Sequence, residues 1–583
     1  MLITGCAYRE ENLRRVVPES KKAQVIDPVE FVNTRVQTQG QESTKRASEG
    51  RKMRHGKKRK EQGGAQMDSA NGPTEGKADE RHICAKPEVA VTGSDMRRRF
   101  PSKDITRIVA DVVVVGAGIA GLSAAASAAE AGAKTIVLEK GATFHTRGLH
   151  NAAINSRLQK QAGIEINRDQ VISTIMEFGA YRGDQRLVTL WADNCGKVMD
   201  WLLDMADAAG IEVILDPTTK PWYFPNYPLI HVFRPNRQET LAQMLQDNAT
   251  VNGARFYFET PAIQLLREGE GRVTGVVGRS VSGDYVRFDA RKAVVLCTGD
   301  YGADREMVQK YLNWNDLKDL KCAYEPAVNT GDGHKMGMAI GAAIDDPPHC
   351  PMMFDWSVWA ERGLFNLARQ PWLYVNIQGE RFMNEDLPWG YECNQLLRQP
   401  NGFAWSVWDG KYDEEWPLMR SQCCKNMGEP TYLWNPNQLT EAIKKGNVLT
   451  AESIETLADK MEVPTDALLQ TVARYNELAR NRRDIDFGKH PERMTTIEKP
   501  LFYACKMESR YMVILSGLRV NTALQVLDTH RKAIQGLYAA GNTSGSFFGG
   551  NVYPTTTPGL THSRAWTFGR LAGLNATNDQ AHG

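Results

Sequence analysis

Residues 112–121 read Val112-Val113-Val114-Val115-Gly116-Ala117-Gly118-Ile119-Ala120-Gly121. Four consecutive valines are typical of a strand that a parallel sheet buries on both faces. The alanine-rich segment from Ile119 to Ala131 is predicted to be helical, and Gly132 can end it in a left-handed conformation. Residues 135–139 are then expected to form a second parallel strand. The sequence therefore predicts a strand, a glycine-rich turn, a helix and a strand in direct succession.

The three glycines of this turn have separate roles. Gly116 permits the tight turn, Gly118 lets a pyrophosphate approach the backbone, and Gly121 lets helix and strand pack closely. The phosphates then lie at a helix N-terminus, where free N–H groups and the helix dipole favour anions. Glu139 stands 23 positions after Gly116, where its carboxylate can accept hydrogen bonds from ribose hydroxyls. The unit predicts dinucleotide binding without distinguishing FAD from NAD.

Length and charge set limits on the class of protein. The chain has 583 residues, which suggests two or three domains at about 100–200 residues per domain. Its formal net charge is +2, so no global field favours nucleic acid or an anionic membrane. Residues 1–104 are polar and carry basic runs at 51–60 and 97–99, and we expect a largely disordered tail. This basic tail is interpreted either as a solvated tail or a mis-assigned start, which we favour, or as a nucleic-acid or membrane patch.

The ten cysteines form no CxxC or CxxCH pattern. The sequence therefore predicts no zinc site, no iron–sulfur cluster and no c-type haem attachment. Free thiols fit a reducing compartment, so a cytoplasmic location is expected. No apolar stretch of about 18 residues could span a bilayer.

Composition divides the ordered part of the chain. Eight of the thirteen tryptophans lie between residues 356 and 434, which predicts a separate cap over about residues 346–500. Its tryptophans are interpreted either as the core of the cap or as a lid over a planar ligand. The nucleotide-binding domain is then expected in two parts, residues 105–345 and residues 501–583, with the cap inserted between them.

A second glycine-rich segment lies near the end of the chain. It begins with Gly536-Leu537-Tyr538-Ala539-Ala540-Gly541-Asn542 and leads into residues 559–570, which read GLTHSRAWTFGR. These stretches resemble the C-terminal flavin motif of the fumarate reductase, succinate dehydrogenase and 3-ketosteroid dehydrogenase flavoproteins, FAD-dependent oxidoreductase family 2. Further matches at residues 297–301, 329–333 and 375–385 fall in that family's order. The resemblance covers about residues 108–575.

This resemblance implies a fold, a cofactor and a set of binding residues. The fold would be α/β, with a Rossmann-like FAD-binding domain interrupted by an inserted α+β capping domain, and the substrate would lie between the cap and the isoalloxazine ring. The residues implied to line the FAD site are Gly116, Gly118, Gly121, Glu139, Lys140, Gly299, Asp332, Gly541, Asn542 and Leu560.

A histidine follows the first flavin segment. Succinate dehydrogenases carry an Arg-Ser-His-Thr stretch there, and its histidine bonds covalently to the flavin. In this chain one extra residue separates Arg147 from His150. We therefore favour a hydrogen-bonding residue in the wall of the site over a flavinylated histidine.

The departures from the family's pattern bear on the substrate. Fumarate reductases carry a proton-donating arginine after the Arg-Phe-x-Asn-Glu stretch, whereas residues 386–391 of this chain read DLPWGY. The family's two carboxylate-clamping residues, a histidine and an arginine, align with Val513 and Val552. Binding two carboxylates in a dry site without paired cations is costly. A small dicarboxylate is therefore disfavoured, although Arg369 lies near an equivalent upstream position.

Other residues resemble the ketosteroid branch of the family. Tyr553-Pro554, followed by Pro558-Gly559, resembles a Tyr-Pro-Gly-Pro-Gly segment in which a tyrosine hydroxyl and a glycine N–H hold the carbonyl oxygen of the substrate. Residues 555–557 interrupt this match with three threonines. Tyr391 lies where the arginine acid would stand, and it is interpreted either as an acid–base group or as a packing aromatic.

The sequence predicts an FAD enzyme that acts on a CH–CH or C=C bond next to a carbonyl of a hydrophobic substrate, such as a ketosteroid or an aryl enoate. The candidate catalytic residues are Tyr553, Tyr391, Gly559 and Arg369. A separate electron donor or acceptor is expected, and nucleic acid is not. Two alternatives remain: a fumarate-type reductase whose arginines come from other positions, and a flavoprotein that has lost catalysis and serves as an interaction subunit.

Overall fold

The computed structural model describes residues 105–581, apart from 217–226, 313–319, 324–327, 358–364, 420–435 and 551. The basic tail, the tryptophan at position 359 and most of the aromatic segment at 221–228 lie outside the described residues, so the predictions about them are not addressed.

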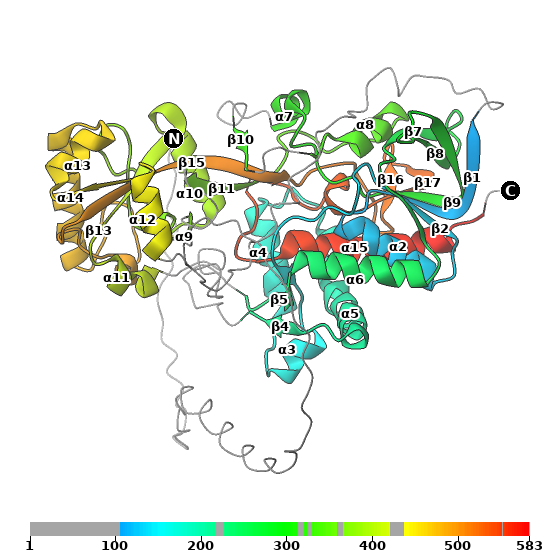
Figure 1. Cartoon of the computed structure of the whole chain (residues 1–583), viewed down its shortest axis with the longest axis horizontal. Coiled ribbons are helices and arrows are strands. Elements are labelled where there is room, and N and C mark those ends of the chain that lie inside the picture. The colour runs from blue at the N-terminus through cyan, green and yellow to red at the C-terminus, as the bar shows by residue number, and fades with distance from the viewer. Residues whose placement is uncertain are drawn as a thin grey trace, which may run out of the picture. The chain divides into compact units, whose positions relative to one another are not determined.

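The first sheet has a parallel core in the order β17-β9-β1-β2-β6 (Figure 1). The antiparallel strand β16 pairs with β17, and the hairpin β7–β8 pairs with β9. The strands span β1 (Thr106–Val115), β2 (Thr135–Leu138), β6 (Arg255–Tyr257), β7 (Ala262–Arg267), β8 (Val273–Arg279), β9 (Tyr285–Leu296), β16 (Gln525–Leu527) and β17 (Ala533–Ala539). The four valines of β1 are buried, as predicted for a strand covered on both faces.

Helices α2 (Ile119–Glu130), α6 (Gln238–Val251) and α15 (Leu560–Asn578) pack side by side in this domain (Figure 1). Small residues allow the close packing of α2 and α15. A Cβ added to Gly569 would stand 2.3 Å from the carbonyl oxygen of Ala120, and one on Gly573 would stand 2.3 Å from that of Ala124. Two segments far apart in the sequence therefore meet backbone to backbone.

The remaining elements of this part surround the core. Trp191 of α5 donates from its indole to Ser563 Oγ at 2.7 Å, which joins α5 to α15. A small antiparallel sheet has the order β3-β5-β4. The elements span β3 (Asn151–Ala152), α3 (Arg157–Gln161), α4 (Arg168–Phe178), α5 (Gln185–Ala209), β4 (Val213–Leu215), β5 (Ile230–Phe233), α7 (Arg305–Leu312), α8 (Asp332–Ala339) and η5 (Gly541–Thr543).

A second sheet is built around the 13-residue strand β15, which pairs with β10, β11, β13 and β14, while β12 pairs with β13. The strands span β10 (Lys321–Cys322), β11 (Pro351–Ser357), β12 (Leu373–Val375), β13 (Phe403–Asp409), β14 (Val448–Ala451) and β15 (Phe502–Ile514). The helices are α9 (Phe365–Ala368), α10 (Trp389–Leu397), η3 (Pro400–Gly402), α11 (Tyr412–Met419), α12 (Pro436–Lys444), α13 (Ile454–Met461), α14 (Thr465–Arg480) and η4 (Pro491–Arg493).

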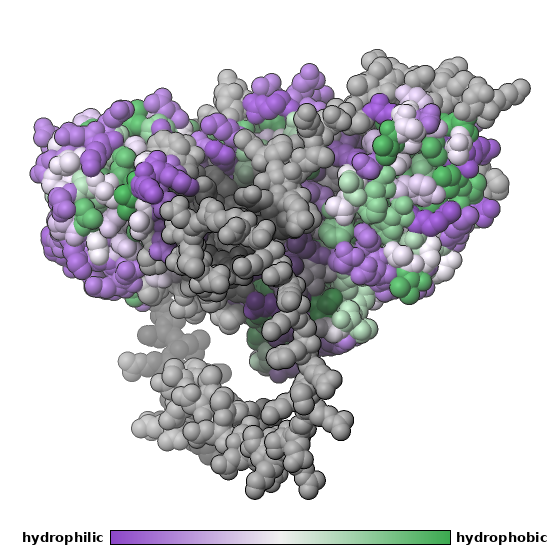
Figure 2. Space-filling model, viewed as in Figure 1, coloured by the Kyte–Doolittle hydropathy of each residue, from purple (hydrophilic) through white to green (hydrophobic). Residues whose placement is uncertain are grey.

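Alternation along β15 and β13 buries both faces of this sheet. Ala504 and Val407 lie in one apolar cluster, whereas Cys505 and Ala404 lie in another. Helices α13 and α14 cover the first face, and hydrophilic residues predominate on their outer surface in Figure 2. The strands of this sheet occur between β9 and β17 in the chain, so an α+β unit interrupts the Rossmann-like domain, as predicted.

The tryptophans of the second sheet pack within these clusters. Trp405 belongs to the cluster beneath α13 and α14, while Trp372 and Trp408 belong to the cluster on the opposite face. The rings of Trp408 and Tyr503 stack at 5.7 Å with an interplanar angle of 4°. For these three residues the interpretation as cap core is confirmed. The strands of the sheet run from residue 321 to residue 514, so they extend beyond the interval 346–500 on both sides.

No helix among the described residues is long and apolar enough to cross a membrane.

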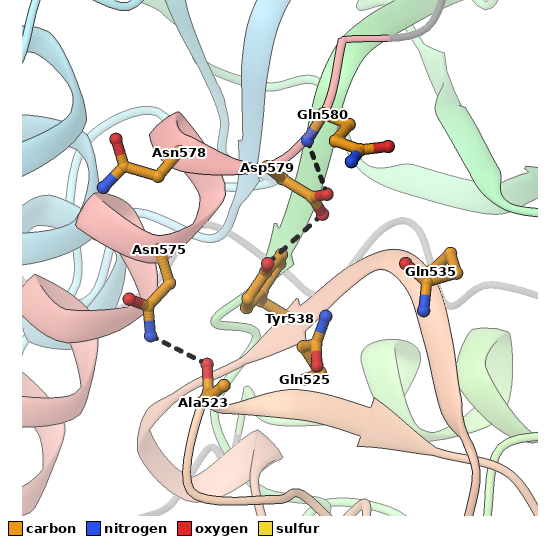
Figure 3. Close-up of a pocket in the computed structure, with 8 residues that line it drawn as sticks. All are labelled: Ala523, Gln525, Gln535, Tyr538, Asn575, Asn578, Asp579 and Gln580. Carbon is orange, nitrogen blue, oxygen red and sulfur yellow. Dashed lines mark hydrogen bonds between the residues drawn. The ribbon is translucent and has the colours of Figure 1, made fainter.

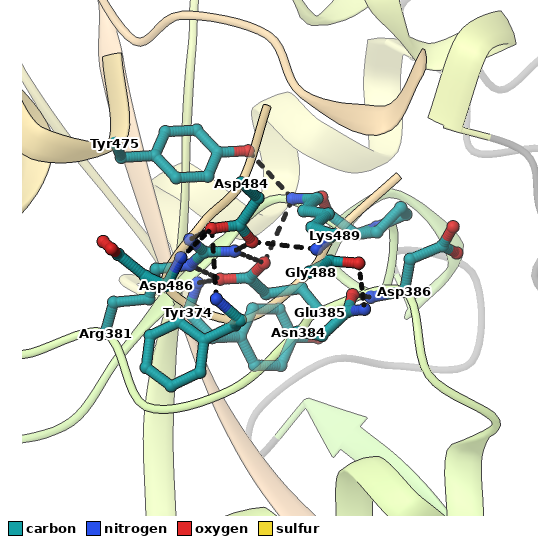
Figure 4. Close-up of polar contacts among 12 residues, drawn as sticks. Tyr374, Arg381, Asn384, Glu385, Asp386, Tyr475, Asp484, Asp486, Gly488 and Lys489 are labelled. Carbon is teal, nitrogen blue, oxygen red and sulfur yellow. Dashed lines mark hydrogen bonds and ion pairs between the residues drawn. The ribbon is translucent and has the colours of Figure 1, made fainter. Parts of the chain in front are cut away.

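A buried network of charges ties the second sheet to the segment after α14 (Figure 4). Glu385 accepts two hydrogen bonds from Arg381, at 2.8 and 3.0 Å, and lies 3.2 Å from Lys489 Nζ. Asp484 also accepts from Arg381, at 2.8 and 3.1 Å, and Lys489 donates to Tyr475 at 2.8 Å. Burial alone would raise the pKa of Glu385, but the charges of Arg381 and Lys489 outweigh it and lower that pKa.

Glu385→Gln removes one charge from this network and leaves Arg381 and Lys489 without their shared carboxylate. We expect a loss of about 3–5 kcal/mol in the free energy of unfolding, as for breaking other buried ion pairs. Urea unfolding followed by tryptophan fluorescence measures it. Asp486→Asn is the matched control, because its partner Arg474 is 43% exposed, and exposed pairs contribute about 0–1 kcal/mol. Equal small losses in both variants would contradict the expectation.

The same network predicts a pH dependence. The pKa values of Glu385 and Asp484 are lowered in the folded chain, because the Arg381 contacts outweigh the opposing effect of burial. The unfolded chain therefore takes up protons first as the pH falls, and this part of the stability is lost below about pH 4. The difference in unfolding free energy between the wild type and Glu385→Gln should be full at pH 7 and smaller at pH 3. A difference that does not change with pH would contradict this account.

Candidate functional site

The four segments predicted to bind a nucleotide follow strands β1, β2, β9 and β17. Each segment begins directly after a residue that pairs with the end of a neighbouring strand. Val115 of β1 pairs with Leu138 of β2 and with Leu296 of β9, and Leu296 pairs with Ala539 of β17. Because these strands are parallel, the segments after them meet at the carboxyl edge of the sheet. Ligands of open α/β sheets bind at this edge.

Steric contacts explain two of the glycines in the first turn. Gly116 has φ +101°, and a Cβ there would stand 2.4 Å from the carbonyl oxygen of Cys297. A Cβ on Gly121 would stand 1.8 Å from the carbonyl oxygen of Gly116. At Gly118 the nearest atom to such a Cβ would be 3.6 Å away, which is ordinary contact. The protein itself therefore tolerates a side chain at Gly118, and the space there fits a ligand.

Glu139 closes this turn. Its carboxylate accepts hydrogen bonds from the N–H groups of Ala117 at 2.7 Å and Gly141 at 2.8 Å. Burial raises its pKa, and the two backbone hydrogen bonds oppose that rise. Two carboxylate oxygens offer about four acceptor sites, so the residue retains capacity for ribose hydroxyls.

Lys140 connects the end of β2 to α8. Its ammonium group donates to the carbonyl oxygen of Val328 at 2.8 Å, to Thr330 Oγ1 at 3.0 Å and to Asp332 at 3.1 Å. Asp332 is buried and begins α8, after Gly331 in a left-handed conformation. The structure therefore brings together the predicted residues Lys140 and Asp332.

Gly299 stands after β9 with φ +77°, and a Cβ there would meet the side chain of Asn329 at 2.8 Å. The next residue, Asp300, is fully buried and accepts from Asn329 Nδ2 at 2.9 Å. Arg147 lies 3.8 Å from the same carboxylate. Neither charge of this pair was predicted as a site residue, although Asp300 directly follows a motif glycine.

The second flavin segment packs on the first. Gly541 has φ +65°, and a Cβ there would stand 2.9 Å from Ala120 Cβ in the first turn of α2. Asn542 accepts a hydrogen bond from Arg564 at 2.9 Å. Leu560 is the first residue of α15, after Gly559 with φ +80°. The predicted glycines, Asn542 and Leu560 therefore lie in segments that converge on the same edge.

Arg564 was not predicted as a site residue. It is fully buried, donates to the backbone oxygen of Ser544 at 3.3 Å, and lies over the rings of Phe547 and Phe548. No ion pair within 4.0 Å is found for it among the described residues. Burial lowers its pKa to about 10. Its place within the flavin-motif segment 559–570 is the sequence signal that could have identified it.

The predicted catalytic tyrosine Tyr553 is buried. Its hydroxyl accepts a hydrogen bond of 3.3 Å from the backbone N–H of Thr561, in the first turn of α15. Its ring lies 5.7 Å from that of Phe548. Tyr553 and Gly559 therefore lie at the positive end of the helix dipole, where negative charge is stabilised.

Tyr391 comes from the inserted unit. A Cβ on the preceding Gly390 would stand 2.4 Å from Val552 Cγ1, so the start of α10 packs on the segment that carries Tyr553. The ring of Tyr391 stacks on Phe178 at 5.3 Å and an interplanar angle of 6°. Burial, and then the nearby charge of Glu177, raise the pKa of its hydroxyl.

Arg369 is engaged in a structural contact. Its guanidinium donates to Asp355 at 2.8 and 3.0 Å, and Tyr374 also donates to that carboxylate, at 3.3 Å. The guanidinium lies over the ring of Trp389, with 4.9 Å to the centroid. Arg369 is 1% exposed and contacts Trp389, the first residue of α10, so it supports the start of that helix. A direct contact with substrate stays a prediction.

The positions that resemble the family's carboxylate clamps are apolar and buried. Val513 is 9% exposed at the end of β15, and Val552 is 4% exposed beside α10. Neither can pair with a carboxylate.

His150 lies against α15. Its backbone oxygen is 3.0 Å from His562 Nδ1, and Gln238 Nε2 is 3.0 Å from the same nitrogen. Burial lowers the pKa of His562, which keeps that ring neutral near pH 7. Whether flavin bonds to His150 stays a prediction.

A surface pocket lies far from these residues (Figure 3). It lies at the C-terminal end of α15, about 25 Å from the helix start at 1.5 Å per residue. Tyr538 donates there to Asp579 at 3.2 Å, and Asn575 donates to the backbone oxygen of Ala523 at 2.9 Å. It contains no group of the predicted site. Among the described residues no cluster could hold a metal ion.

The fold and the carboxyl-edge site define a flavin-dependent oxidoreductase. A family model described as FAD binding domain matches residues 111–554, and the chain belongs to this family. FAD is therefore its cofactor, and the free space at Gly118 fits the approach of the pyrophosphate. The predicted enzyme class, an FAD-dependent oxidoreductase that acts on a CH–CH group, is confirmed, and the substrate stays a prediction.

Relatives come from both branches of the predicted family. The chain is 29% identical over 492 residues to vinyl phenol reductase of Lactiplantibacillus plantarum, covering 80% of this chain and 96% of that protein. It is 27% identical over 486 residues to a probable fumarate reductase of Shewanella frigidimarina, covering 80% and 74%. The structure of 3-ketosteroid-Δ4-(5α)-dehydrogenase from Rhodococcus jostii with 4-androstene-3,17-dione has a TM-score of 0.64 and 23% identity, covering 82% and 98%. The last similarity shows the fold.

Replacing two glycines of the turn separates folding from cofactor binding. Gly118→Ala should leave the melting temperature of the apoprotein unchanged, because its Cβ meets only ordinary contacts, yet weaken FAD binding at least about tenfold. Gly121→Ala should lower that melting temperature, because its Cβ would overlap the Gly116 carbonyl. Circular dichroism of apoprotein and titration with FAD measure the two effects. Equal behaviour of the two variants would contradict this division of roles.

Proposed function

We propose that this flavoprotein reduces, or in reverse forms, a carbon–carbon double bond conjugated to an oxygen-bearing group of a hydrophobic, planar substrate. The oxygen is a carbonyl, as in an aryl enoate or ketosteroid, or the phenolic oxygen of a hydroxyaryl alkene. One observation carries the proposal: the buried hydroxyl of Tyr553, held by the N–H of Thr561, lies in a segment bounded by Val552 and Phe548. The name of the vinyl phenol reductase relative supports an aryl-substituted alkene.

Tyr553 is the group that holds the oxygen of the substrate. The hydroxyl of Tyr553 accepts a hydrogen bond from Thr561, and a phenol hydroxyl that accepts one hydrogen bond can also donate one. In a conjugated carbonyl compound, negative charge develops on the carbonyl oxygen during hydride addition, and a positioned donor stabilises it. In a hydroxyaryl alkene the phenolic proton must first leave and the terminal alkene carbon take up a proton. The hydride then adds to the resulting quinone methide, and the negative charge returns to the oxygen, where the same donor stabilises it. The positive end of α15 adds to this stabilisation. Gly559 fixes the entry into the helix and hence the place of the Thr561 N–H.

Tyr391 is the proposed proton donor. Reduced FAD supplies the hydride from N5 when it is bound, and the second carbon then needs a proton. Burial raises the pKa of Tyr391, so its hydroxyl is protonated near neutral pH and has a proton to donate. The packing of Gly390 on Val552 brings its helix to the segment of Tyr553. Arg369 positions this helix through Trp389.

The apolar residues at the clamp positions disfavour a dicarboxylate. Val513 and Val552 offer no charge, and Arg369 is already paired with Asp355. A fumarate-type reductase would need cations from elsewhere, as each unpaired carboxylate in a dry site is costly. A separate electron donor or acceptor completes the proposal.

An anaerobic experiment tests this proposal. The flavin of the purified protein is reduced with dithionite, and its reoxidation near 450 nm is followed with fumarate, urocanate, aryl acrylates, 4-vinylphenol and unsaturated 3-ketosteroids. We expect rapid reoxidation by an aryl alkene or a ketosteroid. Reoxidation by fumarate alone would establish the dicarboxylate reductase instead. Reoxidation by none of them would favour the non-catalytic interaction subunit.

Tyr553→Phe should lower kcat/KM about 10²–10³-fold, since it removes one donor to the developing oxyanion. Tyr391→Phe should lower kcat about 10²–10⁴-fold, since it removes the general acid. Tyr538→Phe is the control, because this tyrosine is hydrogen-bonded to Asp579 at the opposite end of α15. Stopped-flow reoxidation measures all three. If Tyr553→Phe behaves as Tyr538→Phe does, Tyr553 does not hold the substrate.

The identity of the acid predicts a pH profile. The pKa of Tyr391 is raised above its usual value near 10, because burial disfavours the phenolate. Reduction should therefore be independent of pH from about 6 to 9. A histidine acid would instead give a rate that falls above about pH 6.5. The rate of flavin reoxidation at saturating substrate distinguishes the two.

A further inference from the structure

We infer that Thr555, Thr556 and Thr557 form a hydroxyl-lined turn that recognises the neutral oxygen substituent of the substrate. The inference rests on the proposed substrate site beside Tyr553. It assigns to this chain a specificity element, and it restricts the substrate class to molecules with a neutral oxygen substituent, above all phenols.

The threonine turn is buried, and its side-chain hydroxyls make no hydrogen bond to the described residues. The three residues are 5%, 1% and 0% exposed. None of their hydroxyl oxygens has a hydrogen-bond partner among the described residues, and neither has the hydroxyl of Thr561. Buried polar atoms in proteins are nearly always paired, so four such hydroxyls within seven residues indicate a missing partner.

The hydroxyls are not needed to hold the backbone of the turn in its conformation. The N–H of Thr555 donates to the oxygen of Tyr553 at 2.8 Å, and the N–H of Thr557 donates to the oxygen of Pro554 at 3.0 Å. The N–H of Leu560 donates to the oxygen of Thr557 at 3.3 Å. The turn is therefore held by main-chain contacts, and glycine or alanine side chains would serve it equally well.

The turn lies beside the oxygen-holding tyrosine. The contact between Tyr553 Oη and Thr561 N closes residues 553–561 into a loop, and the three threonines lie within that loop. The segment that this loop resembles in the ketosteroid branch has glycine and proline there. This chain has therefore placed hydroxyls where that segment carries none.

Hydroxyls select a different ligand from the arginine and histidine clamps. A threonine hydroxyl donates one hydrogen bond and accepts others, so it can pair with a phenolic hydroxyl or a ketone. It provides no charge to offset the desolvation of a carboxylate. The valines at positions 513 and 552 likewise provide no charge to a carboxylate. The valines and the threonines therefore all favour a neutral oxygen over an anionic one.

Sites that hydrogen-bond a ligand oxygen reject the analogue that lacks it. The holoenzyme is therefore titrated with 4-ethylphenol and with ethylbenzene, which differ by one hydroxyl, and dissociation constants are read from the perturbed flavin spectrum. We expect 4-ethylphenol to bind at least about tenfold more tightly. In the combined variant Thr555→Val, Thr556→Val, Thr557→Val this ratio should fall at least about threefold, through weaker binding of 4-ethylphenol alone, while Tyr553 retains its own contact with the hydroxyl.

Thr567→Val is the matched control. Its hydroxyl is also buried and has no hydrogen-bond partner in the described part of the chain, but it lies in the interior of α15 outside the loop. This variant should keep the wild-type ratio. The FAD content and FAD dissociation constant of every variant are measured in parallel, together with the single threonine substitutions in case the combined variant fails to fold.

The outcomes separate this inference from the proposed function. An unchanged ratio in the threonine variants, or the same fall in Thr567→Val, would overturn the inference. A drop in FAD affinity with an unchanged ratio would also overturn it, because the hydroxyls would then serve the cofactor. The titration measures binding without turnover, so a failure of every alkene to reoxidise the reduced flavin would reject the proposed function independently.

Discussion

The close approach of backbones around the first turn of α2 is the constraint on which this structure depends. Gly121 lets α2 contact the Gly116 carbonyl, and Gly569 and Gly573 let α15 contact the carbonyl oxygens of Ala120 and Ala124. Without these contacts α15 would stand farther from α2, and its first turn would not reach the carboxyl edge of the sheet. The same contacts that join the two ends of the domain therefore place the N-terminal N–H groups of α15 beside the residues that follow β1, β9 and β17.

The inserted unit depends on a different interaction. Arg381, Glu385, Asp484 and Lys489 neutralise one another in the interior, and the chain leaves this network directly into α10. Arg369 and Trp389 then support the helix, and Gly390 allows it to pack on Val552. A buried ion network gives little net stability but strongly penalises any rearrangement that separates its members. The start of α10, with Tyr391, is thus held by the charge network that precedes the helix and by the packing of Gly390 on Val552.

The fold, the cofactor and the segments that meet at the carboxyl edge could be predicted from sequence because their signals are local. Glycines that need a positive φ or a close contact, a run of valines and an acid at the end of a strand each show their role within a few residues, as Gly116, Gly541 and Glu139 illustrate. The partners of Arg564, Arg369 and Asp300 could not be predicted, because each is set by a contact between segments distant in the chain. The sequence showed that Arg369 survived near a family position, but only the structure shows its pairing with Asp355.

Substrate preference follows from how each member of this fold neutralises the oxygen that acquires charge. Carboxylate substrates carry their charge from the start, and desolvating them requires fixed cations. A conjugated carbonyl, or the quinone methide formed from a hydroxyaryl alkene by proton transfer, acquires charge only as the hydride adds. Neutral donors at a helix N-terminus are then sufficient and do not hold the product too tightly. Valines at the clamp positions, Tyr553 on the N–H of Thr561 and the buried threonine hydroxyls form such a neutral arrangement.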